Sequence, residues 1–306
     1  MSDTPEGTGD VSLHLPRGAV EVSAEELRAR FTRDGYVHLP GVLDRQMVAA
    51  LSAEMDSTEE RTPEPNPLTT GNIRFASNLF YGSTMLRQFL CSDAITHLVR
   101  TLVGDGAWVR WDQAVWKHPG APEFPIHQDN GYNGLEAEHL QLWVALTGMD
   151  EHNGGLLVAA GRHEAVFPHE WVGAHATFDA PVTTTALVVA AGDLVLFSSR
   201  LPHATTPNST DRSRLAYVAE ILPLDVQDET VPWPHFVAFD GPRTGGWLVE
   251  APSDSVESED LVLPAPGGGP SRASSWSSRI RRSVATWRRL PGLGVREGDR
   301  PSSAGG

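Results

Sequence analysis

The sequence predicts a mostly β protein with flanking helices. Short runs rich in apolar, β-branched and aromatic residues follow one another over residues 107–222, and the run His139–Leu146 alternates in polarity as a half-buried strand does. The turn sequence Asn153-Gly154-Gly155 separates two of these runs. With 306 residues, 40% of them apolar, the chain is long enough for one core of about 200 to 250 residues. One main domain, residues 21–250, is therefore expected.

Three helices are expected to precede most of the strands. Ser23-Ala-Glu-Glu26 is a capping box, in which the hydroxyl and the acid serve the free N–H groups of a first helical turn. Asp44 and Ser92 are suited to cap two more helices for the same reason. A Pro- and Thr-rich loop, residues 61–71, is interpreted either as a lid over a site or as a plain connector. The three predicted helices cover about residues 24–33, 45–55 and 93–103.

Two terminal segments differ from this core in composition. Residues 1–20 are rich in Gly, Pro and acidic residues and are expected to be a disordered leader. Residues 251–306 have an excess of Ser, Gly and Pro, and the stretch 271–296 holds seven arginines and no acid. Part of it, 276–290, has the spacing of a short basic amphipathic helix that could contact an acidic carrier protein or an anionic membrane surface. The favoured interpretation is a tail that is disordered or packs on its own acidic domain.

Charge, cysteine content and hydropathy narrow the class of protein. The formal net charge of −15 argues against nucleic acid as a main partner, because non-specific binding to a polyanion needs clustered Lys and Arg. Cys91 is the only cysteine, so no intramolecular disulfide can form, and a buried structural thiol is expected. No apolar stretch is long enough to cross a bilayer, and the N-terminus lacks a signal-peptide pattern. A cytoplasmic protein is therefore expected.

The residues most informative about chemistry are His127-Gln128-Asp129 and the distant His203. Alternate residues of an extended strand point to the same side, so His127 and Asp129 can reach one metal ion while Gln128 faces away. His203 follows the apolar run Leu194–Phe197, which is typical of a buried strand and would deliver the chain to the same site. Two imidazoles and one carboxylate can hold one face of an octahedral Fe(II) and leave the other open for a chelating cosubstrate and O2.

Arg214 begins a further apolar run, Arg214–Val218, after the last of these histidines. Its planar guanidinium suits bidentate pairing with a carboxylate, and the far carboxylate of 2-oxoglutarate is the natural partner. Arg212 is a competitor, but it lies in a polar turn and is expected to face solvent. Lys117 is the only lysine in the chain, and it is interpreted either as a residue that orders the site or as an ordinary surface lysine.

A triplet of the form H-x-D is a weak signal by itself, since such triplets are common without a metal. The ordered set of this triplet, a histidine after a buried strand and an arginine on the next strand is much more specific. His139 is the nearest rival ligand, but its acidic and polar neighbours indicate a solvated strand edge. Sequence signatures of a nucleophile elbow, a Walker loop and a dinucleotide-binding loop are absent.

Four stretches of the chain resemble the phytanoyl-CoA dioxygenase (PhyH) family of Fe(II)/2-oxoglutarate-dependent oxygenases, whose core is a double-stranded β-helix. The likeness covers about residues 20–225, in the family's order, and does not extend to the C-terminal tail. The stretches are an opening helix and strand (Glu26–Leu43), the lead-in to the metal motif (Trp116–Asp129), two paired core strands (Gln141–His163) and the segment with the last ligand and the cosubstrate arginine (Gly192–Val218). The resemblance implies a jelly-roll, cupin-like core.

The resemblance also implies a role for each matching residue. His127, Asp129 and His203 would bind iron, and Arg214 would pair with 2-oxoglutarate, with O2 as the second cosubstrate. Weaker matches around the cosubstrate are Thr205, Trp143 and Gln113, and a strand lysine of the family is matched by Lys117. The residues expected to face a substrate are Arg74, Asn78, Trp111, Lys117, Asn130, Tyr132 and Trp233.

The implied reaction is hydroxylation of an unactivated C–H bond in a small organic molecule. Asp129 favours hydroxylation over halogenation, because related halogenases replace this carboxylate by a small residue that leaves room for chloride; desaturation, epoxidation and cyclisation stay open. The mixed aromatic and polar candidates suit a small or medium-sized molecule. Arginine-rich, lysine-poor sequences are typical of GC-rich bacteria, so the leading prediction is the tailoring of a secondary metabolite, free or carrier-bound.

Alternatives of other kinds stay open. Within the enzyme class, the runner-up is an ectoine-type or amino-acid hydroxylase. Outside it, the chain could be a non-catalytic, cupin-like metal-binding protein, and succinate formation would separate the two because a binder does not consume 2-oxoglutarate. An iron enzyme that needs no cosubstrate is also conceivable, but it would have no use for Arg214. No pattern in the sequence indicates an oligomeric state.

Overall fold

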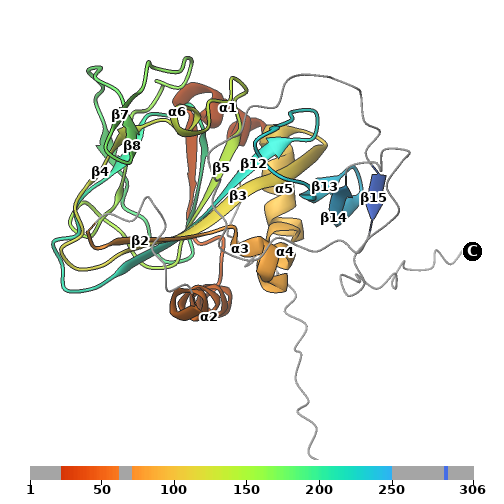
Figure 1. The fold of residues 1–306 in the computed structure, drawn as a ribbon, viewed down its shortest axis with the longest axis horizontal. Helices are drawn as coiled ribbons and strands as arrows, with labels where there is room; N and C mark the ends of the chain where they lie inside the picture. Colours follow the sequence, from red (N-terminus) through yellow and green to blue (C-terminus); the bar gives the residue numbers. More distant parts are fainter. Residues whose placement is uncertain (1–21, 62–70, 250–285, 289–306) are drawn as a thin grey trace, which may run out of the picture.

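Two antiparallel β-sheets face each other and form the core, with most helices on the outside (Figure 1). The structure is a computed structural model, and it describes residues 22–61, 71–249 and 286–288. Both sheets contribute to one apolar cluster, which joins Trp143 and Val195 of the larger sheet to Val158 of the smaller one. The arrangement is the predicted double-stranded β-helix. The smaller sheet consists of β4 (Phe124–His127), β11 (His203–Thr205), β6 (Leu156–Val158) and β9 (Thr185–Ala186).

The larger sheet is built around two long strands, β12 (Arg214–Pro223) and β3 (Gly106–Lys117). Among the described residues it has nine strands. Beyond β12 lie β5 (Leu140–Ala145), β10 (Leu194–Ser198) and β1 (Tyr36–Leu39). Beyond β3 lie β13 (His235–Asp240), β14 (Arg243–Val249) and β15 (Thr286–Arg288), and β2 (Ile73–Ser77) also pairs with β3. A separate hairpin of β7 (Glu170–Val172) and β8 (His175–Thr177) packs against β4.

Alternation along β12 sorts its side chains between two faces of the sheet. Leu215 and Tyr217 belong to an apolar cluster that also contains helix residues, whereas Ala216 belongs to the cluster between the sheets. Pairing with β3 is regular from Arg214 to Glu220, so the alternation is not interrupted there. Arg214 and Glu220 are each an even number of residues from Ala216 and therefore lie on the same face as Ala216. We call this side, which looks toward the smaller sheet, the inner face.

Helices cover the other face of the larger sheet. Buried residues such as Leu51 of α2 and Ile95 of α5 lie in one cluster with Leu215 of β12. Figure 1 shows α4 and α5 on the side of β3 and β12 that is away from β4. Within the described residues, no helix has both the length and the apolar character that a membrane span needs. The helices are α1 (Ala24–Asp34), α2 (Arg45–Arg61), α3 (Leu79–Gly82), α4 (Thr84–Leu90), α5 (Asp93–Val103) and α6 (Asp129–Asn133).

The three predicted helices are confirmed, and two of the three predicted capping side chains form their hydrogen bonds. The Ser23 hydroxyl accepts a hydrogen bond from the Glu26 N–H at 3.1 Å, and Asp44 Oδ1 accepts one from the Met47 N–H at 2.8 Å. Ser92 precedes α5, although its side chain makes no capping bond. The second helix continues to Arg61, past the predicted end near residue 55. Its extra turns follow from a sequence without Gly or Pro up to that point.

The tail differs from the prediction where it is described. Residues 286–288 are extended and pair with β14, so the short helix proposed over 276–290 is wrong for these three residues. Pairing with an open sheet edge supplies hydrogen bonds that a short isolated helix would lack. The leader 1–20, most of the loop 61–71 and the rest of the tail lie outside the described residues. The boundaries of the 21–250 domain therefore stay a prediction.

One buried carboxylate ties the helices to the larger sheet. Asp112 of β3 is fully buried, and it accepts hydrogen bonds from the N–H groups of Leu79 and Phe80, at 2.6 and 3.0 Å, and from the Tyr217 hydroxyl at 2.8 Å. Burial raises the pKa of Asp112 to about 7, against the opposing effect of these three hydrogen bonds. The side chain thus fixes the start of α3 against both β3 and β12.

We expect Asp112→Ala to destabilise the fold by about 3 kcal/mol or more, because each buried donor left unpaired costs about 1–3 kcal/mol. Urea unfolding measures the change. Tyr217→Phe is the matched control, since it removes only one of the three bonds and should cost about 1 kcal/mol. Equal, small effects of the two substitutions would show that Asp112 does not hold the helices.

Candidate metal centre

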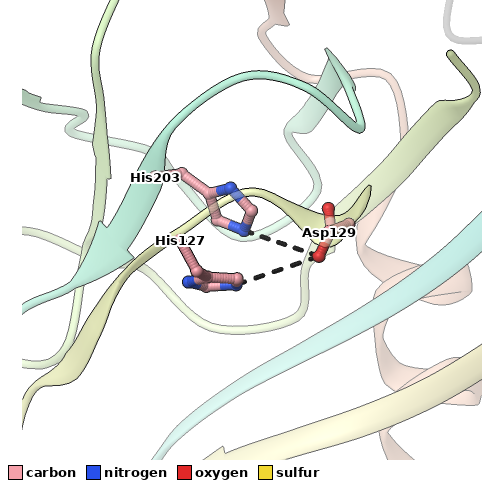
Figure 2. Close-up of side chains that lie close together, drawn as sticks. All are labelled: His127, Asp129 and His203. Atoms are coloured by element: carbon pink, nitrogen blue, oxygen red, sulfur yellow. Dashed lines mark ion pairs between the residues drawn. The ribbon is translucent and has the colours of Figure 1, made fainter. Parts of the chain in front are cut away.

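The three predicted metal ligands lie together at one end of the jelly roll. His127 ends β4, Asp129 opens α6, and His203 starts β11 directly opposite His127. Asp129 Oδ1 is 3.8 Å from His127 Nε2 and 4.0 Å from His203 Nε2, and one ligand atom from each residue falls within 4.8 Å of the others. Figure 2 shows the three side chains pointing toward one another. Their donor atoms surround a point at which one ion can sit.

The local backbone of this motif differs from the expected extended strand. β4 stops at His127, and Gln128 is the residue before α6, which begins at Asp129. Gln128 is fully buried and turned away from the ligands, as predicted: its amide donates to the carbonyls of Ala165 and Arg200 and accepts from the Phe167 N–H at 2.7 Å. The turn after the strand, rather than strand alternation, brings the carboxylate beside the two rings.

Hydrogen bonds fix the orientation of both imidazoles. His127 Nδ1 is 2.8 Å from the Pro125 carbonyl and His203 Nδ1 is 2.9 Å from the Leu201 carbonyl. A carbonyl only accepts, so each Nδ1 carries the proton and each Nε2 keeps its lone pair for the centre. Burial lowers the pKa of His203 to about 4, and burial followed by the nearby His203 ring lowers the pKa of His127 well below its usual value. Both rings are neutral, as metal binding requires.

Asp129 completes a donor set that fits a divalent cation. Burial, and next the charge of Glu220, raise the pKa of Asp129 well above its usual value, while Arg110 opposes the rise. Both neighbouring imidazoles are neutral, so the half-buried Asp129 carboxyl has no cation among the three ligand residues. A divalent ion there would supply the missing charge, and two imidazoles with one carboxylate are the donors that Fe(II) sites of this class use.

Two buried cations lie side by side next to this centre. Lys117 and Arg214 are direct partners across β3 and β12, and each is only 1% exposed. Arg214 donates from Nε and Nη2 to the Gly154 carbonyl at 2.9 and 2.7 Å, and Lys117 Nζ donates to Thr205 Oγ1 at 2.9 Å. Neither forms an ion pair with an acid in the described part of the chain. Two buried cations without an acidic partner are unfavourable, so this pair is expected to bind an anion.

The pKa values of the two cations reflect this lack of compensation. Burial, followed by the charge of Arg214, lowers the pKa of Lys117 to about 7, and burial lowers that of Arg214 to about 9. Gly154 lies against both residues: its carbonyl holds Arg214, and a Cβ at this position would be 2.7 Å from Lys117 Cδ. Its φ of +91° also favours glycine. The predicted Asn-Gly-Gly turn is therefore part of the site.

The other predicted cosubstrate residues lie at different distances from this pair. Thr205 is in direct contact with Lys117, and the Arg214 guanidinium lies 5.9 Å from the centre of the Trp143 ring. Gln113 is four residues from Lys117 on the same face of β3, which places it about 13 Å away along the strand. Its side-chain Oε1 is buried and has no partner among the described residues.

Of the predicted substrate residues, Tyr132 contacts a metal ligand and Trp111 lies on the inner face of the larger sheet. The Tyr132 ring stands perpendicular to the ring of His127 at 5.3 Å between centroids, and its outer side meets Trp171 of β7 at 5.5 Å. Trp111 lies on the inner face of β3, opposite Glu220 of β12. Tyr132 belongs to α6, whereas Trp111 belongs to β3 of the larger sheet.

The other substrate candidates, apart from Lys117, have different surroundings. Arg74 pairs with Trp116, which belongs to the helix-side cluster, so Arg74 is on the opposite face from Lys117. Asn78 precedes α3 on that side of the sheet, and the amide of Asn130 donates to the carbonyls of Leu135 and Ala137. Trp233 stacks on His235 at 4.1 Å.

A group of charged residues that the sequence analysis missed lies beside Asp129. Arg110 donates from Nη1 to Glu220 Oε2 and from Nε to Asp228 Oδ2, both at 2.6 Å. We call Arg110, Glu220 and Asp228 the Arg110 network. His139, expected at a solvated edge, is 3% exposed and lies 3.8 Å from Glu220, so that expectation is wrong. The sequence did hold one sign of this network, because Glu220 is an acid within the apolar sequence of β12.

A β-bulge places Arg110 in this network. Trp111 pairs with Glu220 and Val109 with Ile221, which leaves Arg110 as an extra residue in β3. Extra residues of this kind bend a strand and redirect a side chain, and they are frequent beside active sites. The bulge turns Arg110 to the inner face, where regular alternation would have turned it toward the helices.

A jelly roll that holds two histidines and an aspartate next to a buried cationic pair defines a non-haem iron oxygenase site. The model of the phytanoyl-CoA dioxygenase (PhyH) family matches residues 31–216, and the chain belongs to this family. It is a dioxygenase that depends on Fe(II), 2-oxoglutarate and O2. The resemblance seen in the sequence is thereby confirmed.

Known relatives and structures agree with this assignment. The chain is 27% identical over 206 residues to the 2-aminoethylphosphonate dioxygenase of an uncultured bacterium, HF130_AEPn_1, covering 63% of this chain and 79% of that protein. It is 26% identical over 247 residues to the multifunctional dioxygenase prhA of Penicillium brasilianum, covering 71% and 80%. The crystal structure of the epimerase SnoN from nogalamycin biosynthesis, in complex with Fe3+ and α-ketoglutarate, has the same fold, with a TM-score of 0.59 at 23% identity over 86% of this chain and 98% of SnoN.

Proposed function

We propose that this dioxygenase hydroxylates, or otherwise oxidises, an unactivated C–H bond of a small organic molecule in secondary metabolism. The observation that carries the proposal is the adjacency of two groups: a neutral-imidazole and carboxylate set on one side, and the uncompensated pair Lys117 and Arg214 on the other. The metabolic setting is supported by the likeness to SnoN, which is an epimerase from nogalamycin biosynthesis. The name of prhA describes a multifunctional dioxygenase.

His127, Asp129 and His203 would hold the iron through one face. When bound, Fe(II) and 2-oxoglutarate supply the activation of O2 that the cleavage of a C–H bond needs. The chain's part is to hold both imidazoles as neutral Nε2 donors, through the carbonyls of Pro125 and Leu201. With three protein ligands on one side, the opposite side stays available to the cosubstrates.

Arg214, Lys117 and Thr205 would bind the far carboxylate of 2-oxoglutarate. Arg214 uses Nε and Nη2 for the Gly154 carbonyl, which leaves Nη1 for the ligand. Lys117 donates to Thr205 Oγ1, so the hydroxyl proton of Thr205 can point to the same carboxylate. Trp143 covers the guanidinium on one side. Thr205 follows His203 by two residues on β11, which ties the anion site to the metal site.

An anaerobic titration tests the proposal directly. Full-length, metal-free protein receives Fe(II) and then 2-oxoglutarate, and a visible charge-transfer band of the chelate is expected to saturate at one equivalent. Admission of O2 should then release succinate. Bound iron without a band would overturn the 2-oxoglutarate reading in favour of a cosubstrate-free enzyme. A band without any succinate, across a panel of small-molecule substrates, would indicate a metal-binding protein instead.

Cosubstrate affinity should depend on pH through Lys117. Its pKa of about 7 in the free protein should rise when a carboxylate binds, so binding takes up a proton above pH 7. Affinity is therefore expected to be highest below pH 7 and to fall as the pH rises toward the higher pKa of the complex. Calorimetry at pH 8 in two buffers of different ionisation enthalpy should show uptake of about one proton.

Lys117→Met serves as the control for this pH dependence. The variant keeps the length of the side chain but cannot be protonated, so its weaker binding should be independent of pH and take up no proton. Unchanged proton uptake in the variant would assign the titration to another group.

A further inference from the structure

The two ends of the inner face of β12 carry opposite charges. Arg214 and Glu220 share this face and are separated by about 20 Å, at 3.3 Å per residue. The metal ligands lie between these ends: Thr205, next in line to His203 on β11, contacts the Arg214 end, whereas Glu220 and Arg110 are the charges that act on Asp129. If 2-oxoglutarate occupies the cationic end, as proposed above, the Arg110 network is on the side left for the substrate.

The Arg110 network has bonding capacity that the protein does not use. Both oxygens of Asp228 have partners, since Oδ2 accepts from Arg110 and Oδ1 accepts from the N–H and hydroxyl of Thr230. Glu220, by contrast, uses only Oε2, and Arg110 uses only Nε and Nη1. Within the described residues, Glu220 Oε1 and Arg110 Nη2 thus have no hydrogen bond. The network therefore keeps one acceptor and one donor that a ligand could use.

A second, independent observation points to a ligand at the same place. Gln141 of β5 is the direct partner of Glu220, so both side chains are on the inner face. Gln141 is 1% exposed, and its Nε2 has no hydrogen-bond partner among the described residues. A buried donor without a partner costs about 1–3 kcal/mol, and native proteins rarely leave one unless something else binds it. The group that binds here must therefore accept as well as donate.

The charges around the site favour an uncharged ligand. The Arg110 network has one cation and two anions, and His139 beside it is neutral because burial lowers its pKa. The network and Asp129 together contribute two negative charges, and Arg214 and protonated Lys117 contribute two positive ones; Glu123, whose charge also acts on Lys117, is exposed to solvent. Since Fe(II) and 2-oxoglutarate also cancel each other, an added ammonium or carboxylate group would leave a buried charge unpaired, which is costly.

We propose that Arg110, Glu220 and Gln141 form a subsite for neighbouring hydroxyl groups on an uncharged ring, such as a sugar or cyclitol unit of the substrate. One hydroxyl donates to Glu220 Oε1, and hydroxyl oxygens accept from Arg110 Nη2 and Gln141 Nε2. Trp111, opposite Glu220, offers an aromatic surface to the C–H side of the ring. The subsite orients the ring so that a C–H bond faces the metal side of Asp129.

Ligand-detected saturation-transfer NMR tests the proposal without turnover. The full-length protein is loaded with Zn(II) in place of iron and with 2-oxoglutarate, and three probes are compared: trans-cyclohexane-1,2-diol, cyclohexanol and cyclohexylammonium. The diol is expected to give the strongest signal. Glu220→Met, which keeps the side-chain length without an acceptor, should weaken diol binding about fivefold, the loss expected for one hydrogen bond. If that variant does not fold, Arg110→Lys, which keeps the charge without Nη2, takes its place.

Glu138→Gln is the matched control, because this exposed acid next to His139 forms no part of the network; it should leave all signals unchanged. The strongest signal from cyclohexylammonium, equal signals from the three probes, no probe signal at all, or diol binding that is unaffected at Glu220 would each overturn the hydroxyl subsite. The signal of 2-oxoglutarate itself, recorded in the same samples, separates this failure from failure of the proposed function. If 2-oxoglutarate gave no signal, both the proposed function and the hydroxyl subsite that rests on it would be overturned.

Discussion

Asp129→Ala is expected to lower Fe(II) affinity by at least about a hundredfold, since even residues that only orient metal ligands contribute about 10–100-fold. Succinate formation should fall below detection in the same variant. The fold should survive, because the raised pKa of the wild-type carboxyl reflects an unfavourable environment without a cation. Thermal unfolding of the metal-free variant should therefore be unchanged or slightly higher than that of the wild type.

Thermal shifts with metal separate a ligand role from a structural one. A bound ion stabilises the native state by mass action, so Fe(II) or Zn(II) should raise the unfolding temperature of the wild type but not that of the variant. Asp211→Ala is the matched control, because the Asp211 side chain is 96% exposed and pairs only weakly with Arg212. An equal metal-induced shift in Asp129→Ala would exclude this carboxylate as a ligand.

Arg214→Ala is expected to weaken 2-oxoglutarate binding by at least about thirtyfold, because truncating one partner of a buried charged pair costs about 2–5 kcal/mol. Loss of the charge-transfer band at one equivalent of cosubstrate, with iron still bound, is the readout. Arg214→Lys should not restore binding: one ammonium cannot both serve the Gly154 carbonyl from two nitrogens and reach the ligand.

Arg212→Ala controls for a general loss of positive charge. The Arg212 side chain is 90% exposed, in agreement with its expected place in a polar turn, and its removal should change cosubstrate affinity less than about twofold. A large effect at Arg212, or none at Arg214, would reverse the choice made between these two arginines.

The metal motif was predictable because it depends on residue order and on buried strands. His203 follows a fully buried strand, and strand pairing places it opposite His127. The H-x-D pattern and the later histidine were therefore enough to predict that the three ligands lie together. The local turn that carries Asp129 to the site was not predictable, since it depends on bonds from the Gln128 side chain to the carbonyls of Ala165 and Arg200, which are 37 and 72 residues on. Contacts of this range leave no local pattern.

The second charged end of the inner face was missed for a related reason. Whether Arg110 points inward depends on a bulge, which is a property of strand pairing and not of the residues beside it. His139 has the neighbours of a surface residue but is covered in the folded chain. Arg74 lies on the face of the sheet opposite to Lys117, because neighbouring residues along β2 take opposite faces, and the strand register that decides this cannot be seen in the sequence.

Placing Arg214 and Glu220 on one unbroken strand has a consequence for how such a site can change. The distance between Arg214 and Glu220 is set by covalent geometry and by the rise per residue of β12. Movements of the surrounding loops, or substitutions in them, therefore cannot change this distance. New substrates would have to be accommodated sideways, through the residues on neighbouring strands and the β7–β8 hairpin. The length between the anion end and the far end of the inner face would stay the same throughout such divergence.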